Sequence, residues 1–256
     1  MQALRDEDLD VSIAVWDDNS VDWDAFDLVV VRSTWDYAPR RAEFLDWARS
    51  VPRLLNPADV IAWNTDKTYL RELEAAGIPI VPTTWLQPGD RFTPPDHAFV
   101  VKPTVSAGAR DTAAYPAGAA SHAQQLLDAG RPVMVQPYVD AVDEAGETSL
   151  LLFDGELSHA ARKSAILRVG TGVRNDINSR SFVTPAEATA EQRDLAQAVL
   201  AAVGQDLLYA RVDLLPGPVL IELELTEPSL FLKHSPGSAQ RFAQAVARAA
   251  AARRRS

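Results

Sequence analysis

The stretch LLYARVDLLPGPVLIELELT, residues 207–226, consists of two apolar runs on either side of Pro216-Gly217-Pro218. Short apolar runs around a turn rich in Pro and Gly predict two strands that pair as a hairpin. Because residues two apart on a strand share a face, Glu222 and Glu224 point the same way, and pairing across the turn brings Asp213 beside them. The hairpin therefore predicts three carboxylates in one patch.

This carboxylate patch lies within a sheet that is otherwise apolar. Three crowded negative charges are unfavourable there without a cation, and carboxylate oxygens are ligands that suit a Mg²⁺ ion bridging phosphates. A second interpretation stays open, in which the patch is a solvated sheet face with Arg211 as its counterion. The pattern thus indicates an oxygen-bound metal site or a salt-bridged surface.

Lysine is scarce in this chain, since only four of its 25 basic residues are lysines. Arginine serves as the ordinary surface cation, so a lysine can mark a position that needs a compact ammonium group. Lys67, Lys102 and Lys163 lie where a nucleotide-phosphate site would need one. A helix capped at residue 65 or 66 is expected to run to residue 76, which places Lys67 in its first turn, where a cation is unfavourable unless an anion binds. Compositional accident is the alternative.

Composition bounds the class of protein. At 256 residues and 47% hydrophobic content, the chain can bury one large core or two to three smaller lobes. The absence of cysteine excludes disulfides and thiolate metal sites, and the four histidines show no metal-ligand spacing. The net charge of −10 argues against nucleic-acid binding. With no apolar run of about 18 residues and no basic leader, we expect a cytoplasmic protein without a membrane partner.

Apolar periodicity elsewhere predicts alternating strands and helices. Residues 2–9 indicate the tail of a helix, and because an α/β unit normally opens with a strand, we expect a truncated N-terminal lobe that lacks its first strand. Asp154-Gly155 predicts a second tight hairpin. The strands of this hairpin are expected at 148–153 and 157–163, and a polar loop is expected to follow at 164–181. We expect the other strands at 11–16, 28–31, 97–102 and 132–138. We expect helices at 40–50, 121–129 and 185–203 and a last helix from residue 236.

The order of these features resembles the ATP-grasp superfamily over nearly the whole chain. The motifs that carry the resemblance are Asn64 to Lys67, Val101-Lys102-Pro103 before a loop of small residues, Gln136-Pro137-Tyr138, Arg211-Val212-Asp213 and Ile221 to Glu224. The resemblance implies an α/β and α+β fold in which two α+β lobes clasp ATP beside an N-terminal α/β lobe. The expected lobes are residues 1–62, 63–134 and 135–256.

The resemblance also implies roles for single residues in nucleotide binding. Lys67 and Lys102 would contact the phosphates, Ser106, Gly108 and Arg110 would belong to a lid, Gln136, Pro137, Tyr138 and Val139 would form the adenine-binding hinge, and Glu147 would lie near the ribose. For Glu147, a solvated hairpin entry is the alternative. The expected lid has only one glycine, where the family usually has several.

For the chemical step, the resemblance implies that Asp213, Glu222 and Glu224 hold Mg²⁺, with Mn²⁺ as a substitute. Glu224 stands where the family usually has an asparagine. Arg211 and Lys163 would be catalytic, acting on the transferring phosphoryl group, although Lys163 also fits a plain basic strand edge. Arg32, Ser33 and Thr34 are weaker candidates for substrate binding. They follow an expected strand at the end where open α/β sheets bind ligands, and would hold a substrate carboxylate unless they form a local turn.

Two segments narrow the resemblance. VRSTWDY at residues 31–37 and ELELTEPSLFL at residues 222–232 are similar to stand-alone ATP-grasp proteins that include the D-cycloserine-forming cyclo-ligase of antibiotic biosynthesis. The implied reaction converts a small amino-acid-like carboxylate to an acyl phosphate, which a nitrogen nucleophile attacks. A homodimer would be in keeping with the family. Two other hypotheses stay open: an ATP-binding protein without turnover, and a hydrolase that uses Asp213 and Glu222 as an acid and base pair.

Overall fold

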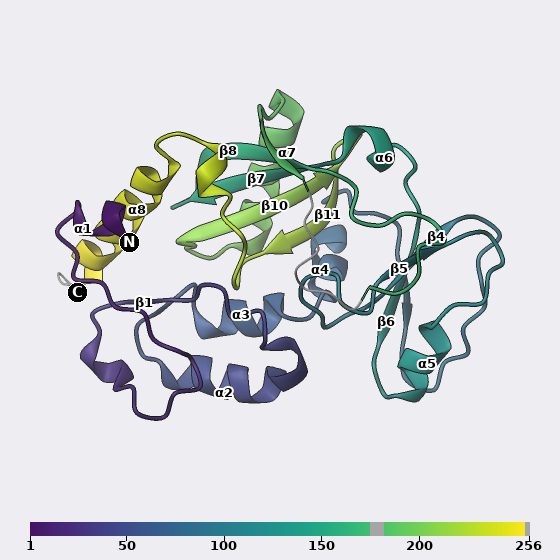
Figure 1. Ribbon diagram of the computed structural model, residues 1–256, viewed down its shortest axis with the longest axis horizontal. Coiled ribbons are helices and arrows are strands. Elements are labelled where there is room, and N and C mark those ends of the chain that lie inside the picture. The colour runs from purple at the N-terminus through teal and green to yellow at the C-terminus, as the bar shows by residue number, and fades with distance from the viewer. Residues whose placement is uncertain (175–181, 254–256) are drawn as a thin grey trace.

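The computed structural model describes residues 1–174 and 182–253 and arranges them around two antiparallel sheets and one small parallel pair (Figure 1). The central sheet has the strand order β3-β6-β4-β5, and the C-terminal sheet has the order β11-β10-β7-β8-β9. Part of the loop expected at 164–181 lies outside the described residues. The mixed α/β and α+β class predicted from the sequence is confirmed.

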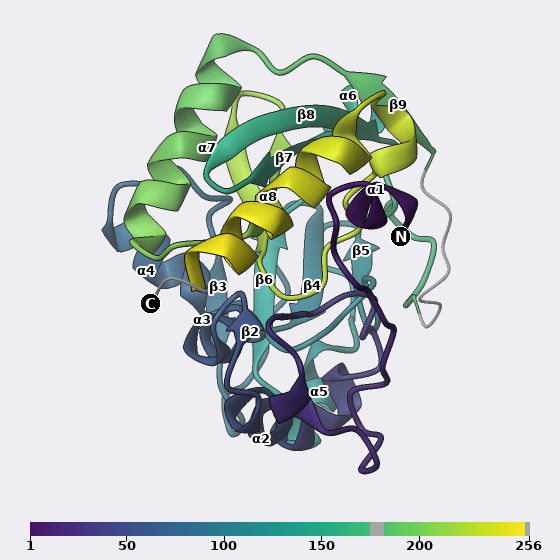
Figure 2. The ribbon, with the colours of Figure 1, turned by 90° about the vertical axis from the view of Figure 1, so that its left-hand side faces the viewer.

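The N-terminal lobe is built on aromatic packing. Its elements are α1 (Gln2–Arg5), η1 (Trp23–Ala25), β1 (Val29–Val30), η2 (Ala38–Arg40), α2 (Arg41–Ser50), β2 (Leu54–Leu55) and α3 (Ala58–Asn64). Strand β1 pairs in parallel with β2, and Phe44 of α2 stands edge-on to Trp16 at 5.4 Å between ring centres. The helix expected at 2–9 ends at Arg5, and α1 lies against the C-terminal helix (Figure 2).

The strand expected at residues 11–16 does not form. No strand pairs with this segment among the described residues. The nearby strand β1, which could have been its neighbour, pairs with β2 alone. Ile13 and Val15 consequently face solvent at 83% and 60% exposure, while Trp16 alone turns inward. The short apolar run was compatible with a buried strand, but a strand also needs a neighbour that satisfies its backbone.

The central sheet consists of short strands with one covering helix. Its elements are α4 (Tyr69–Ala75), β3 (Thr84–Leu86), β4 (Phe99–Pro103), β5 (Ala113–Tyr115), α5 (Ala123–Asp128) and β6 (Val133–Pro137). Strand β6 pairs with β4 along its whole length, from Val133 to Pro137. A lobe boundary between residues 134 and 135 would therefore cut a hydrogen-bonded strand.

The C-terminal sheet confirms both predicted hairpins. Its elements are α6 (Val142–Ala145), β7 (Glu147–Phe153), β8 (Glu156–Lys163), β9 (Val183–Ala186), α7 (Ala190–Val203), β10 (Tyr209–Leu215), β11 (Val219–Glu224), η3 (Leu232–His234) and α8 (Ser238–Arg253). The helix expected at 185–203 begins only at Ala190, because Thr189 and Gln192 form a capping box there and the preceding residues pair as β9.

Alternation along β10 separates the two faces of this sheet. Val212 and Leu214 pack under α7, whereas Tyr209 packs under α8, which crosses the sheet in Figure 2. Because residues two apart on a strand share a face, the side chains of Arg211 and Asp213 lie on the same face of the sheet as Tyr209. The polar side chains of β10 therefore lie on the face that α8 covers only at one end.

The outer edge of β11 is closed by side chains rather than by a strand. The Tyr69 hydroxyl donates to Leu223 O at 2.9 Å and accepts from Leu223 N at 2.8 Å. Asn64 donates to Leu223 O and accepts from Leu225 N, both at 2.8 Å. An isolated bridge between Ile80 and Leu220 extends this closure. These contacts fix the strand that carries Glu222 and Glu224.

The expectation for Lys67 within this region was wrong. Helix α3 ends at Asn64 and α4 begins at Tyr69, so Lys67 lies in the turn between them rather than in a helical first turn. Asp66 accepts a bond from Thr68 N at 3.1 Å, which is a turn geometry that competes with helix, and Lys67 N donates to Thr104 O at 2.8 Å. Tertiary contact with the loop after β4 thus decides the backbone here.

Candidate active site

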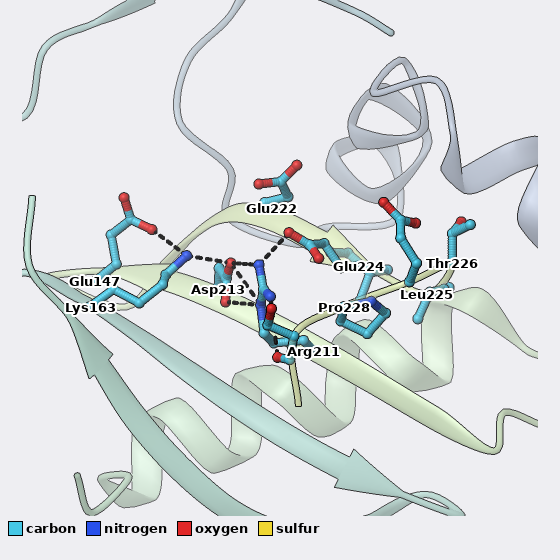
Figure 3. A network of polar contacts seen from close by, with 12 residues as sticks. Glu147, Lys163, Arg211, Asp213, Glu222, Glu224, Leu225, Thr226 and Pro228 are labelled. Atoms are coloured by element: carbon cyan, nitrogen blue, oxygen red, sulfur yellow. Dashed lines mark hydrogen bonds and ion pairs between the residues drawn. The ribbon is translucent and has the colours of Figure 1, made fainter. Parts of the chain in front are cut away.

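The predicted carboxylate patch forms at the β10–β11 hairpin. Asp213 is paired with Glu222 and Arg211 with Glu224 in the strand register. One carboxylate oxygen from each of Asp213, Glu222 and Glu224 lies within 4.8 Å of the other two (Figure 3). Asp213 is fully buried and the two glutamates are partly exposed. Three hard oxygen ligands converging at this spacing suit Mg²⁺, so the residues present fit the expected metal.

Cations surround the deepest carboxylate. Lys163 Nζ lies 2.7 Å from Asp213 Oδ2 and 2.8 Å from Glu147 Oε2. Arg211 contacts Asp213 through Nε at 3.0 Å and Nη2 at 2.9 Å, and also pairs with Glu224. Burial alone would raise the pKa of Asp213, but Arg211 and Lys163 hold it well below its usual value. Asp213 is therefore an anion throughout the physiological range.

The pKa values of the other two carboxylates, Glu222 and Glu224, shift in opposite directions. Burial opposes ionisation of Glu222, but the ammonium groups of Lys67 and Lys102 lower its pKa below the ordinary value. Lys67 Nζ lies 3.1 Å from Glu222 Oε1. Burial raises the pKa of Glu224 to about 7 despite the neighbouring Arg211. The carboxylate that replaces the usual amide is thus the one most easily neutralised, and a metal ion would favour its ionised form.

Lys102 differs from the other cations because it has no ion pair within the described residues. Burial lowers the pKa of Lys102 to about 8, although Glu222 partly opposes the effect. Its position on β4 places it on the central sheet, across from the hairpin. A desolvated ammonium without a partner is a ready site for an anionic ligand.

Lys102 also lines a cavity between the two sheets. The other lining residues are Val81, Val100, Gln136, Pro137, Tyr138, Val139, Val142, Glu147, Ala165, Ile166, Leu167, Leu215 and Ile221. The structure thus brings the four residues of the expected adenine hinge and Glu147 to one apolar cavity. Gln136 donates to Thr83 at 2.8 Å, whereas its Oε1 is buried without a partner and can accept a bond from a ligand.

The expected lid lies beside Lys67. Ser106 is buried and its carbonyl oxygen accepts a bond from Lys67 Nζ at 3.0 Å. Gly108 and Ala109 both have positive φ, at 63° and 59°, so the loop turns sharply there. Arg110 N closes the turn by donating to Ala107 O at 3.3 Å. The role of Ser106, Gly108 and Arg110 as a nucleotide lid remains a prediction.

The three candidates for substrate binding lie at the junction of the N-terminal lobe with the C-terminal sheet. Arg32 Nη2 donates to Pro228 O at 2.6 Å, and Arg32 Nη1 is buried without a partner. Thr34 Oγ1 is likewise buried without a partner, whereas Ser33 is exposed and has φ of 57°. The structure brings Arg32 and Thr34 to one junction and leaves the Ser33 side chain toward solvent.

The sequence did not reveal the roles of three residues near this site, Asn64, Tyr69 and Glu227. Asn64 and Tyr69 hold the backbone of Leu223, between the two glutamates of β11. Glu227 is buried with an exposure of 8%. An acidic residue directly before Pro228 in an apolar segment was a signal for Glu227, but nothing local indicated that another lobe would cover it.

Comparison with known proteins places this arrangement in a family. Residues 1–56 match the family described as the N-terminal domain of D-cycloserine synthetase DcsG. The cycloserine biosynthesis protein DcsG of Streptomyces lavendulae is 39% identical over 274 residues, which cover 96% of this chain and 91% of that protein. The chain belongs to the DcsG family of ATP-grasp ligases.

Solved structures agree with this assignment to the DcsG family. The crystal structure of D-cycloserine synthetase DcsG has a TM-score of 0.85 and 36% identity over 97% of this chain and 92% of that one. D-alanine–D-alanine ligase from Bacillus anthracis complexed with ATP shares the fold at 16% identity, with a TM-score of 0.54 over 75% of this chain and 68% of that one. The ATP-grasp ligase PsnB complexed with a minimal precursor also shares the fold at 16% identity, with a TM-score of 0.56 over 89% of this chain and 79% of that one.

Membership in the DcsG family confirms the predicted superfamily, fold and enzyme class. The protein is an ATP-dependent ligase, and the interpretation as an ATP-binding protein without turnover is not favoured. ATP and Mg²⁺ are used by the wider ATP-grasp family, whose structures include complexes with ATP and with Mg and ADP. Among the described residues, no helix combines the length and apolarity needed to cross a bilayer.

Proposed function

We propose that this ligase activates the carboxylate of a small amino-acid-like substrate and closes a ring, as a cyclo-ligase of the D-cycloserine-forming type. The observation that carries the proposal is the convergence of three carboxylates and their paired cations at the β10–β11 hairpin, beside the cavity that the unpaired Lys102 and Glu147 line. The 39% identity to the cycloserine biosynthesis protein DcsG supports this substrate class.

In the proposed first step, a carboxylate oxygen of the substrate attacks the γ-phosphorus of ATP, and the bond to the ADP oxygen breaks. When bound, Mg²⁺ would neutralise phosphate oxygens. Asp213, Glu222 and Glu224 would hold that ion, and Mn²⁺ would replace it with the same oxygen ligands. Lys67 and Lys102 would offset the charge of the phosphates, with Arg211 and Lys163 next to the transferring group. The chain therefore contributes mainly positioning and charge compensation.

In the second step, a nitrogen of the same substrate attacks the acyl carbon, the bond from that carbon to the phosphate oxygen breaks, and the nitrogen loses a proton as inorganic phosphate leaves. The cavity lined by Gln136, Pro137, Tyr138 and Val139 would hold the adenine, and the partnerless Gln136 Oε1 can accept a bond from its amino group. Arg32 and Thr34, with their partnerless polar atoms, would hold the substrate carboxylate, and Ser33 has the weakest case of the three. Ser106, Gly108 and Arg110 would cover the phosphates, and Glu147 would face the ribose.

The proposal also includes boundaries for the three lobes. We place the N-terminal lobe at residues 1–62 and end the central lobe at residue 137 rather than 134, since β6 pairs with β4 up to Pro137. The C-terminal lobe then begins with Tyr138 and contains the carboxylate patch. ATP would bind between the central and C-terminal sheets.

The test is ADP release by the purified protein with Mg²⁺ or Mn²⁺ and a panel of small amino acids. The panel includes serine derivatives that carry an aminooxy or ureido nitrogen, because that nitrogen can reach the carboxyl carbon to close a ring. Transfer of ¹⁸O from the labelled substrate carboxylate into phosphate would report the acyl phosphate. Release of ADP without ¹⁸O transfer would refute this chemistry and favour plain ATP hydrolysis.

Variants link the activity to the patch. Asp213→Asn should lower kcat by about 100-fold or more, a usual loss when charge stabilisation of the transition state is removed. Because Asp213 is fully buried, Glu222→Gln, at a partly exposed position, serves as a second variant with the same expected direction. Asp206→Asn changes an exposed carboxylate on the approach to β10 and should be neutral. Full activity in both patch variants would overturn the assignment.

A further inference from the structure

The loop that follows β11 is fastened to the loop that follows β1. Trp35 Nε1 donates to Glu227 O at 3.3 Å, and Arg32 Nη2 donates to Pro228 O at 2.6 Å. The Tyr209 hydroxyl lies between them and bonds to Val31 O at 3.0 Å and to Thr226 O at 2.7 Å. Residues of the N-terminal lobe therefore hold the backbone of Glu227 and Pro228, while Tyr209 of β10 holds Thr226.

The side chain of Glu227 has no such support. It is 92% buried, given its 8% exposure, yet its carboxylate has no hydrogen bond or ion pair within the described residues. Burial raises the pKa of Glu227 to about 8, and the nearby charge of Glu224 adds to the effect. The carboxylate oxygens of Glu227 are not among the polar atoms that the protein fully encloses, so this largely buried side chain presents a charge without a protein partner where a ligand can reach it.

The same junction holds two further polar atoms without partners. Arg32 Nη1 and Thr34 Oγ1 are both buried and unbonded, although the Arg32 Nη2 atom is satisfied. Arg32 lies near enough to Glu227 for the two charges to influence each other, but they form no ion pair. An anion, a cation and a hydroxyl that are kept apart at one site match a ligand that carries both charges.

We propose that Glu227 binds the ammonium group of the amino-acid substrate. The inference rests on the proposed function, in which the carboxylate of the substrate reacts and its α-amino group does not. An ammonium group supplies a positive charge and three donors, which is what a desolvated carboxylate lacks. Glu227 follows Glu224 by three residues, and its chain neighbours Thr226 and Pro228 lie beside the carboxylate patch in Figure 3. The ammonium would therefore be bound next to that patch.

Glu227→Gln tests the proposal, because it keeps the shape of the side chain and removes its charge. Loss of one charge-assisted bond should raise KM for the amino-acid substrate by about 10- to 100-fold, while KM for ATP stays within about twofold. Glu227→Asp should recover part of the loss. Glu191→Gln, an exposed glutamate on α7, is the matched control and should leave both constants unchanged.

A substrate analogue without the α-amino group separates recognition from a structural role. Wild-type enzyme should bind this analogue weakly, and Glu227→Gln should bind it as well as wild type does or better. Equal losses for the substrate and the deamino analogue would overturn the proposal, as would an unchanged KM for the amino acid. A drop in kcat alone would also contradict it, since it would assign Glu227 to the chemical step.

The two proposals can fail separately. If the wild-type protein releases no ADP with any amino acid, the proposed function fails. Calorimetric titration of the amino acid into the protein loaded with a non-hydrolysable ATP analogue and Mg²⁺ then decides the role of Glu227. Binding to wild type that weakens at least tenfold in Glu227→Gln would support ammonium recognition, and equal binding, or none, would refute it.

Discussion

Replacing Tyr69 with phenylalanine isolates the contact that holds the metal-bearing strand. The Tyr69 hydroxyl, on a side chain that is 2% exposed, is both donor and acceptor for the backbone of Leu223. The change leaves a buried N–H without a partner, at about 1–3 kcal/mol, and removes a second bond worth about 1 kcal/mol. We expect Tyr69→Phe to lower the free energy of unfolding by about 3 kcal/mol.

For a protein of this size, that loss corresponds to a fall in Tm of roughly 6–12 °C. Urea unfolding followed by circular dichroism measures the free energy, and calorimetry measures Tm. Because Leu223 lies between Glu222 and Glu224, the concentration of Mg²⁺ needed for half-maximal ADP release should also rise. Tyr115→Phe is the matched control, since among the described residues its hydroxyl bonds only to the side chain and backbone of His122. A Tm within 2 °C of wild type together with an unchanged Mg²⁺ dependence would refute the reasoning.

Four other outcomes are expected. Since burial lowers the pKa of Lys102 to about 8, kcat/KM for ATP should fall as the pH rises through that value, and Lys102→Arg should abolish this dependence. Between pH 8 and the ordinary lysine pKa of 10.5, the unfolded chain binds more protons than the folded chain, so the stability of wild type relative to Lys102→Met should rise across that window in urea titrations. EDTA should abolish ADP release yet leave Tm unchanged in the absence of nucleotide, because Lys163 and Arg211 already compensate Asp213. Thr189→Ala removes the capping box of α7 and should cost about 1 kcal/mol of stability with no change in kcat.

The parts of the fold that follow from local pattern were predictable. The period of two in residues 207–226 and the Asp154-Gly155 turn specified both hairpins, and through them the meeting of Asp213 with Glu222 and Glu224. These features depend on residues close in the sequence. The resemblance to the ATP-grasp superfamily assigned Lys102 and the hinge to one nucleotide site, and these residues line one cavity in the structure.

The features that depend on contact between lobes were not predictable. Lys67 was expected in a helix, but its backbone bonds to Thr104 in the loop after β4. Residues 11–16 form a short apolar run of the kind found in buried strands, but no strand pairs with them among the described residues. Glu227 became a candidate only because Trp35 and Arg32 dock on its loop. In each case the deciding partner lies more than 35 residues away or is missing, and no local pattern reports it.

The closure of β11 by Asn64 and Tyr69 has a consequence for self-association. An open sheet edge can recruit a strand from another molecule, which leads to aggregation or to dimers joined by strand addition. At the β11 edge the backbone groups of Leu223 and Leu225 are already bonded. At the opposite edge, β9 contains Pro185, which has no N–H to donate. Within the described residues, both edges of the C-terminal sheet therefore resist strand addition, so a homodimer joined through this sheet would have to form through side chains.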